Sequence, residues 1–239
     1  MELPEIPGMV DVTPQTDATE QPEQQQAEQQ EPEFDLSKCL QTVKELRARQ
    51  IPERKQICGE WLHEGDTGMI FAKRGIGKTW FSMALANAIS RGSKFGEWQC
   101  ASTGKVVYLD TEMHLKDLQK RADVLNLDDD ISFITAEDVL DKLEEPLNLN
   151  NTFHQRAIEQ IVNQGDVLFI DNLSTGSRGA EENNNDHAEQ VLDFQLRLRS
   201  KGVTVVLIHH AGKNGTSRGN SRKEDWLNWI IELKAKDDD

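Results

Sequence analysis

Short apolar runs alternate with stretches of helical periodicity along most of the chain. The apolar runs predict strands at 69–72, 105–110, 131–135, 167–171 and 203–209. The helical stretches lie near 78–91, 114–125, 152–163 and 186–200. Continuous apolar strands separated by helices are typical of a mostly parallel sheet with helices on both faces. We therefore expect an α/β domain over 61–239, with ligands beyond the carboxyl ends of its strands.

The first 35 residues have a different composition from the rest. They contain five prolines, seven glutamines and ten acidic residues, with no lysine or arginine. Such a segment cannot bury enough apolar surface to offset its ordering entropy, so we predict a disordered acidic tail over 1–35. Ten of the fifteen net negative charges fall there, which leaves −5 for the remainder. The acidic balance therefore does not exclude a nucleic-acid partner for the folded part.

A helical lead-in over 36–60 is expected to join the tail to the domain. Its helix would cover 37–50, with Ser37 at the cap and Leu40, Val43 and Leu46 on one face. At the other end of the chain, we expect 229–233 to be the last apolar segment of the domain.

Nothing in the sequence indicates a membrane or a disulfide framework. There is no 18-residue apolar run, and the N-terminus lacks a basic region followed by an apolar one. Cys39, Cys58 and Cys100 have no metal-binding or redox spacing, so we expect reduced thiols in a cytoplasmic protein.

The segment Ala-Lys-Arg-Gly-Ile-Gly-Lys-Thr at 72–79 follows one predicted strand and opens a predicted helix. Strand, glycine loop and helix in this order indicate a P-loop, whose backbone N–H groups bind a polyphosphate. Lys78 would reach the terminal phosphates of ATP, and the Thr79 hydroxyl would bind Mg²⁺. Ala72 replaces the first glycine of the pattern and is tolerated if its φ is negative. The expected ATP-binding residues are Arg74, Gly75, Ile76, Gly77, Lys78, Thr79 and Trp80.

Acidic residues follow two of the predicted strands. Asp171 ends the strand 167–171, where a carboxylate usually holds the Mg²⁺ of a P-loop site. The next residue, Asn172, cannot act as a base, so hydrolysis needs another carboxylate. Glu112, just beyond the strand 105–110, is the candidate base; the alternative is a solvated Glu at the start of the next helix. Asp110 is less suited because it lies within the strand.

His209 and His210 end the last predicted strand and precede a glycine-rich basic segment. A histidine there can sense the γ-phosphate, although paired histidines at a strand end are often structural. Lys213, Arg218 and Arg222 follow. Their alternatives are a charged finger for phosphoryl transfer, a clamp on nucleic acid, or an ordinary solvated loop.

Taken together, these motifs resemble RecA-like ATPases, and within them the RepA family of hexameric replicative helicases of broad-host-range plasmids. The resemblance covers about residues 60–233 and also includes the Glu-Glu-Asn run at 181–183. Members of the family usually continue with further strands after the segment that corresponds to 229–233, so the resemblance implies a domain truncated at its C-terminal end. It implies a ring of six subunits that binds ATP between them and acts on single-stranded DNA. In that ring Glu112 would polarise water, His209 or His210 would sense the γ-phosphate, and Arg218 would act across the interface.

The same resemblance implies DNA contacts through Arg178, Lys213 and Arg222. The hypothesis from another class is a regulatory ATP-binding switch that controls a protein partner, with the acidic tail as docking arm for a replication protein. A small-molecule kinase is disfavoured because no acceptor-binding lid is evident.

Overall fold

The computed structural model describes residues 35–177, 185–211 and 226–235. The chain divides into two compact units, 1–51 and 52–239. Residues 1–34 lie outside the described part, so the expected tail stays a prediction.

The first unit contains a short 3-10 helix, η1 (Leu36–Cys39), and the helix α1 (Val43–Ala48). The expected single helix capped by Ser37 is wrong. Asp35 caps η1, and Thr42 starts α1 through a capping box with Glu45, in which each residue bonds the backbone N–H of the other. Leu40 lies between the helices in extended backbone, which ends the first helix before the second begins.

The second unit is built on a six-stranded sheet in which every pair of neighbouring strands is parallel. This confirms the expected α/β fold. In spatial order the strands are β10 (Trp229–Leu233), β3 (Thr67–Ala72), β9 (Thr204–His210), β8 (Val167–Asp171), β6 (Val106–Asp110) and β7 (Ser132–Thr135).

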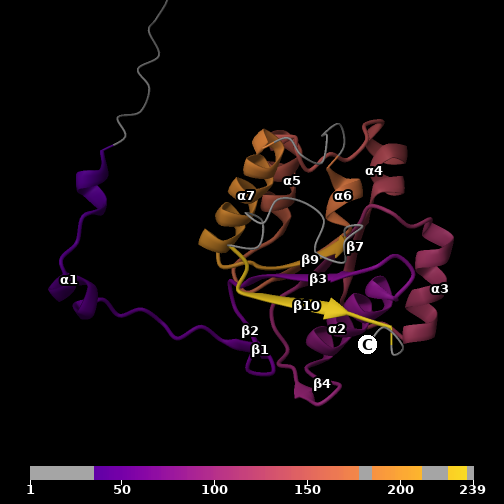
Figure 1. Cartoon of the computed structure of the whole chain (residues 1–239), viewed down its shortest axis with the longest axis horizontal. Helices are drawn as coiled ribbons and strands as arrows, with labels where there is room; N and C mark the ends of the chain where they lie inside the picture. Colours follow the sequence, from indigo (N-terminus) through magenta and orange to yellow (C-terminus); the bar gives the residue numbers. More distant parts are fainter. Residues whose placement is uncertain (1–34, 178–184, 212–225, 236–239) are drawn as a thin grey trace, which may run out of the picture. The chain divides into compact units, whose positions relative to one another are not determined.

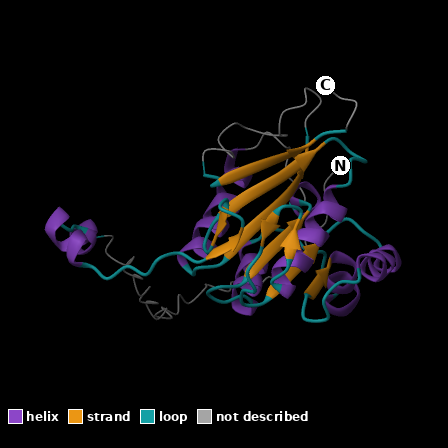
Figure 2. Cartoon of the chain, turned by 90° about the horizontal axis from the view of Figure 1, so that it is seen from below, coloured by secondary structure: helices purple, strands orange, loops and turns teal. Residues whose placement is uncertain are grey.

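Helices cover both faces of this sheet (Figures 1 and 2). One face packs against α2 (Lys78–Arg91) and α3 (Leu115–Leu125). The other packs against α4 (Ala136–Leu143), α5 (Thr152–Ile161), α6 (Leu173–Gly176) and α7 (Asn185–Ser200). The short helices α4 and α6 were not expected, because one or two turns give too few positions for a helical period to show.

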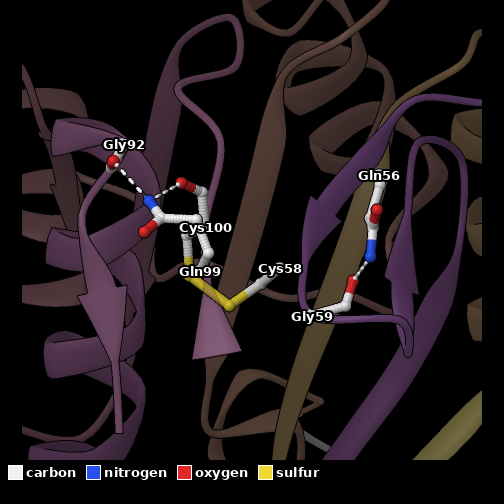
Figure 3. Close-up of a disulfide and its surroundings, with 6 residues drawn as sticks. All are labelled: Gln56, Cys58, Gly59, Gly92, Gln99 and Cys100. Carbon is white, nitrogen blue, oxygen red and sulfur yellow. Dashed lines mark hydrogen bonds between the residues drawn. A yellow bond between two sulfur atoms is a disulfide. The ribbon is translucent and has the colours of Figure 1, made fainter. Parts of the chain in front are cut away.

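Two short hairpins border the α2 face of the sheet. They are β1 (Gln56–Cys58) with β2 (Leu62–His63), and β4 (Lys94–Phe95) with β5 (Trp98–Gln99). A disulfide between Cys58 and Cys100 joins the first hairpin to the end of the second (Figure 3). The expectation of three reduced thiols is therefore wrong for these two residues, because the fold brings together cysteines 42 positions apart. Cys39 is a free, exposed thiol.

The strand β10 lies at the edge of the sheet beside β3, in register from Trp229 opposite Gly68 to Leu233 opposite Ala72. The Trp229 indole lies directly on Gly68, where an added Cβ would be 1.9 Å from the ring. The glycine is therefore required by the close approach of this side chain. None of the helices in the described ranges is long and apolar enough to span a bilayer.

Candidate nucleotide site

The loop between β3 and α2 has the backbone that a P-loop needs. Gly75 and Gly77 have φ values of +88° and +101°, which side-chain-bearing residues rarely adopt. Gly77 is the N-cap of α2, so the first free N–H groups of this helix face the loop. Ala72, which stands where the P-loop pattern has its first glycine, ends β3 in strand conformation. Its φ is not positive, so alanine is tolerated there.

Lys78 turns back beneath the loop. Its side chain is buried, and its Nζ atom lies 3.4 Å from the carbonyl oxygen of Ala72 and 3.5 Å from that of Lys73. Burial lowers the pKa of Lys78, while the carboxylates of Asp171 and Glu112 oppose this shift. A desolvated cation held by carbonyl groups and flanked by carboxylates is ready to bind an anion that enters the loop.

Asp171 is buried at the end of β8 and is held by hydroxyl groups from two other elements. Tyr108 of β6 donates to its Oδ2 atom at 2.8 Å, and Thr79 of α2 donates a further hydrogen bond. The Tyr108 hydroxyl also lies 2.7 Å from Ser82 Oγ, which fixes the phenol. Burial raises the pKa of Asp171, and the hydrogen bonds from Thr79 and Tyr108 oppose this rise.

Asp110 lies beside Asp171 in the sheet register. Its Oδ1 atom accepts from the backbone N–H groups of Met113 (2.8 Å) and Glu112 (3.2 Å). Burial raises the pKa of Asp110 to about 6. Its buried Oδ2 atom has no hydrogen-bond partner among the described residues. Asp110 therefore shapes the turn that carries Glu112 and leaves one acceptor facing the protein interior.

Glu112 is anchored in this turn and is bound by three side chains. Asn172 donates to its Oε2 atom at 2.8 Å, His210 Nε2 lies 3.4 Å from the same oxygen, and Arg74 lies 3.6 Å from Oε1. Burial raises the pKa of Glu112, but the hydrogen bonds from Asn172 and His210 and the charge of Arg74 outweigh it and lower the pKa. Glu112 is therefore a carboxylate at neutral pH, as a proton acceptor must be.

The two histidines at the end of β9 point to opposite faces of the sheet. His209 is buried on the face opposite α2, because it alternates with the strand residues of the α2 face. His210 lies on the α2 face beside Glu112. Burial and the charge of Lys78 lower the pKa of His210, with Glu112 opposing, so the imidazole is neutral at pH 7. Of the pair, only His210 lines the cleft that the P-loop borders.

These groups line one cleft of about 650 Å³ at the carboxyl edge of the sheet. The Thr79 hydroxyl and the Asp171 carboxylate are hydrogen-bonded to each other there, and both are the hard oxygen ligands that Mg²⁺ prefers. The donor set therefore fits Mg²⁺, which would neutralise phosphate charge when bound. The cleft is lined by Arg74, Gly75, Gly77, Lys78, Thr79, Trp80, Glu112, Met113, His114, Asp117, Lys120, Arg121, Val124, Asp171 and His210.

The structure thus gathers most of the residues expected at the site. Ile76 belongs to the same loop, while His209 lies on the other face. Arg178, Lys213, Arg218 and Arg222 lie outside the described residues. The sequence reasoning missed Tyr108, Asn172 and Arg121, whose roles depend on neighbouring strands and helices. Only the position of Asn172 directly after Asp171 could have drawn attention to it.

A glycine loop with a buried lysine at a helix start, next to a strand-end aspartate, defines a P-loop nucleotide-binding protein. The sequence model of a family described as AAA domain matches residues 30–216, well over half of the chain. The chain belongs to this family of P-loop ATPases.

No curated protein matches the sequence. Two solved structures are similar to this one. They are the flagellar accessory protein FlaH from Methanocaldococcus jannaschii (13% identity, 71% of each chain covered, TM-score 0.47) and a KaiC-like protein from Pyrococcus horikoshii OT3 (18% identity, 74% of this chain and 76% of the other, TM-score 0.48). These likenesses concern the fold alone.

Proposed function

We propose that this ATPase is a DNA motor of the replicative-helicase type, which hydrolyses ATP as a ring of six and acts on single-stranded DNA. The observation that supports the motor is the position of His210. This residue contacts Glu112 and stands two positions before a segment, 212–225, that contains four basic residues. When the γ-phosphate is lost on hydrolysis, His210 loses a contact. The segment that follows His210 in sequence is where DNA would be bound, so the change can be transmitted to the DNA.

The residues of the cleft divide the hydrolytic work among them. Lys78 and the loop N–H groups hold the phosphates, and Thr79 with Asp171 holds Mg²⁺. Glu112 orients the attacking water and accepts its proton, for which it must exchange its hydrogen bond from Asn172 for one with water. His210 donates a neutral hydrogen bond near the γ-phosphate. Arg218 of a neighbouring subunit acts as the arginine finger, whose planar fork suits the transferring phosphoryl group.

DNA binding in this proposal is electrostatic and uses Arg178, Lys213 and Arg222. Each phosphate contact in single-stranded DNA contributes about 0.7 to the slope of log K against log salt. Arg222→Ala should therefore make that slope shallower by about 0.7, while Arg218→Ala should change it little. Equal slopes for wild type and Arg222→Ala would remove Arg222 from the DNA interface.

The deciding experiment mixes Arg218→Ala subunits into wild-type protein with saturating single-stranded DNA. If the finger acts across a ring whose subunits hydrolyse ATP in a coordinated way, ATPase activity falls more steeply than the mole fraction of mutant, because one site without its finger, which is worth about 10³–10⁵ in kcat, stalls the other sites. Native mass with and without MgATP should show a six-subunit particle. A linear loss of activity would argue against coordinated subunits, and a monomeric mass in both conditions would argue against the ring.

The second candidate is a regulatory switch whose ATP state controls a protein partner. The observation that favours it is that Asn172, His210 and Arg74 all occupy the Glu112 carboxylate, which therefore is not yet free to bind water. In this case a protein bound through the acidic tail releases Glu112. ATPase stimulation by single-stranded DNA supports the motor; unchanged ATPase with DNA, together with stimulation by a tail-binding replication protein, supports the switch.

A further inference from the structure

The nucleotide cleft has a second end that the phosphate chemistry does not use. Beyond Thr79 it continues along the outer surface of α2 to α3, where it is lined by Trp80, Arg121 and Val124. Trp80 is 38% exposed and Val124 is 73% exposed, so apolar surface is open to solvent inside a polar cleft. Uncovered apolar side chains in a concave site gain free energy when a flat ligand covers them.

Arg121 and Trp80 already form a stacked pair at this end of the cleft. The guanidinium carbon of Arg121 lies 5.2 Å from the centre of the Trp80 ring. Arginine stacks on aromatic faces because its planar cation is weakly hydrated and is attracted by the ring quadrupole. The same two groups, one flat and aromatic and one flat and cationic, are those on which nucleobases stack in proteins.

The position of Trp80 on α2 places it in the same cleft as the phosphate-binding loop. Trp80 follows Lys78 by two residues, about 3 Å along the helix axis. Lys78 is buried beneath the loop whereas Trp80 is exposed, so phosphate and base would occupy opposite ends of one cleft. We propose that the base of the bound nucleotide stacks on the Trp80 indole, with the Arg121 guanidinium moving from the indole onto the outer face of the base.

This inference rests on the proposed nucleotide-binding function and names its substrate class. Every base can stack on an aromatic face, but a purine covers more of the indole than a pyrimidine does and therefore buries more apolar surface. The subsite therefore selects purine over pyrimidine nucleoside triphosphates. In this proposal Trp80 and Arg121 bind the base, whereas the residues of the P-loop bind the phosphates.

The test measures Kd for MgATP, MgUTP and inorganic tripolyphosphate with the full chain. Trp80→Ala should weaken MgATP binding by about 5- to 150-fold, the usual worth of one stacked base, and should weaken MgUTP binding less. It should leave tripolyphosphate binding within about twofold, because tripolyphosphate has no base. Trp80→Phe should retain most of the affinity for ATP, which also guards against a variant that fails to fold, and Arg121→Ala should weaken ATP but not tripolyphosphate. Trp98→Ala is the matched control, since Trp98 is similarly exposed (42%) but does not line this cleft.

Several results would overturn the base subsite while leaving the ATPase assignment intact. These are unchanged ATP affinity in Trp80→Ala, or an equal loss for ATP and tripolyphosphate. An equal loss for ATP and UTP would overturn the purine preference. Failure of the proposed function looks different: the wild-type protein would bind neither ATP nor tripolyphosphate, or Lys78→Ala would bind both as tightly as wild type.

Discussion

At the scale of single residues, the site depends on one buried cation and two acidic groups with different surroundings. Asp171 is enclosed by the hydroxyl groups of Tyr108 and Thr79, whereas Glu112 is bound by the Asn172 amide, the His210 imidazole and the Arg74 guanidinium. Two carboxylates in such different surroundings can take separate roles, one as ligand and one as base. This division leads to two predictions.

Lys78→Ala should abolish tight ATP binding and turnover. The substitution removes a desolvated donor to the β- and γ-phosphates. The backbone conformation of the loop should remain, because it depends on Gly75 and Gly77. Equilibrium binding and steady-state ATPase assays measure the effect, with circular dichroism as a control for folding. ATPase activity within twofold of wild type would contradict the P-loop assignment.

Glu112→Gln should leave ATP binding nearly unchanged and slow hydrolysis by about 10²–10⁴, the usual worth of a positioned general base. Glutamine keeps the shape of the side chain but cannot accept the proton of water. Single-turnover hydrolysis with saturating Mg²⁺ measures the chemical step. If Glu112→Gln hydrolyses normally and Asp110→Asn does not, the base is Asp110.

At the scale of the elements, the sheet brings together ends that are distant in sequence. The ends of β6, β8 and β9 meet because these strands are neighbours, so Asp110, Asp171 and His210 share one rim and one face. The hairpins at the other side of α2 are joined covalently instead, through Cys58 and Cys100. Short hairpins bury little surface by themselves, so the cross-link should matter for stability.

Replacing Cys58 and Cys100 by serine should lower the free energy of unfolding by at most about 4 kcal/mol, the loop-entropy value for a cross-link over 42 residues. For a chain of this size that corresponds to a fall in Tm of about 8–16 °C. Calorimetry of the double variant and of reduced wild type should agree.

Cys39→Ser is the control for this experiment, because Cys39 is exposed and unpaired. A thiol count on the unfolded, unreduced protein should find one free thiol. Three free thiols, or an unchanged Tm in the double variant, would contradict the cross-link.

At the scale of the whole molecule, charge is distributed very unevenly. Residues 1–35 carry ten of the fifteen net negative charges, whereas the segment 212–225, which follows β9 in sequence, contains four basic residues. Segments of opposite charge attract different partners, so the acidic tail and the basic segment should act independently of each other. The tail and the ATPase unit should therefore be separable.

Deleting residues 1–34 should leave Tm and basal ATPase activity almost unchanged, because this composition cannot contribute a packed core. Thermal unfolding and ATPase assays on the two chains make the comparison. A loss of several degrees would show that the tail packs on the domain.

The sequence by itself determined the long elements and the P-loop. Strands such as 167–171 and helices such as 78–91 have the predicted bounds, because each has enough positions for an apolar run or period to show. Gly75, Gly77 and Lys78 were readable because the phosphate-binding backbone is local to one loop.

Only the tertiary structure decided the strand order, the face to which each histidine points, and the partners of Glu112. It also decided that Cys58 meets Cys100 and that Arg121 stacks on Trp80. Each of these contacts joins residues from separate elements. Their energies come from packing and hydrogen bonds that exist only once the sheet and its helices have assembled, so no local pattern of residues records them.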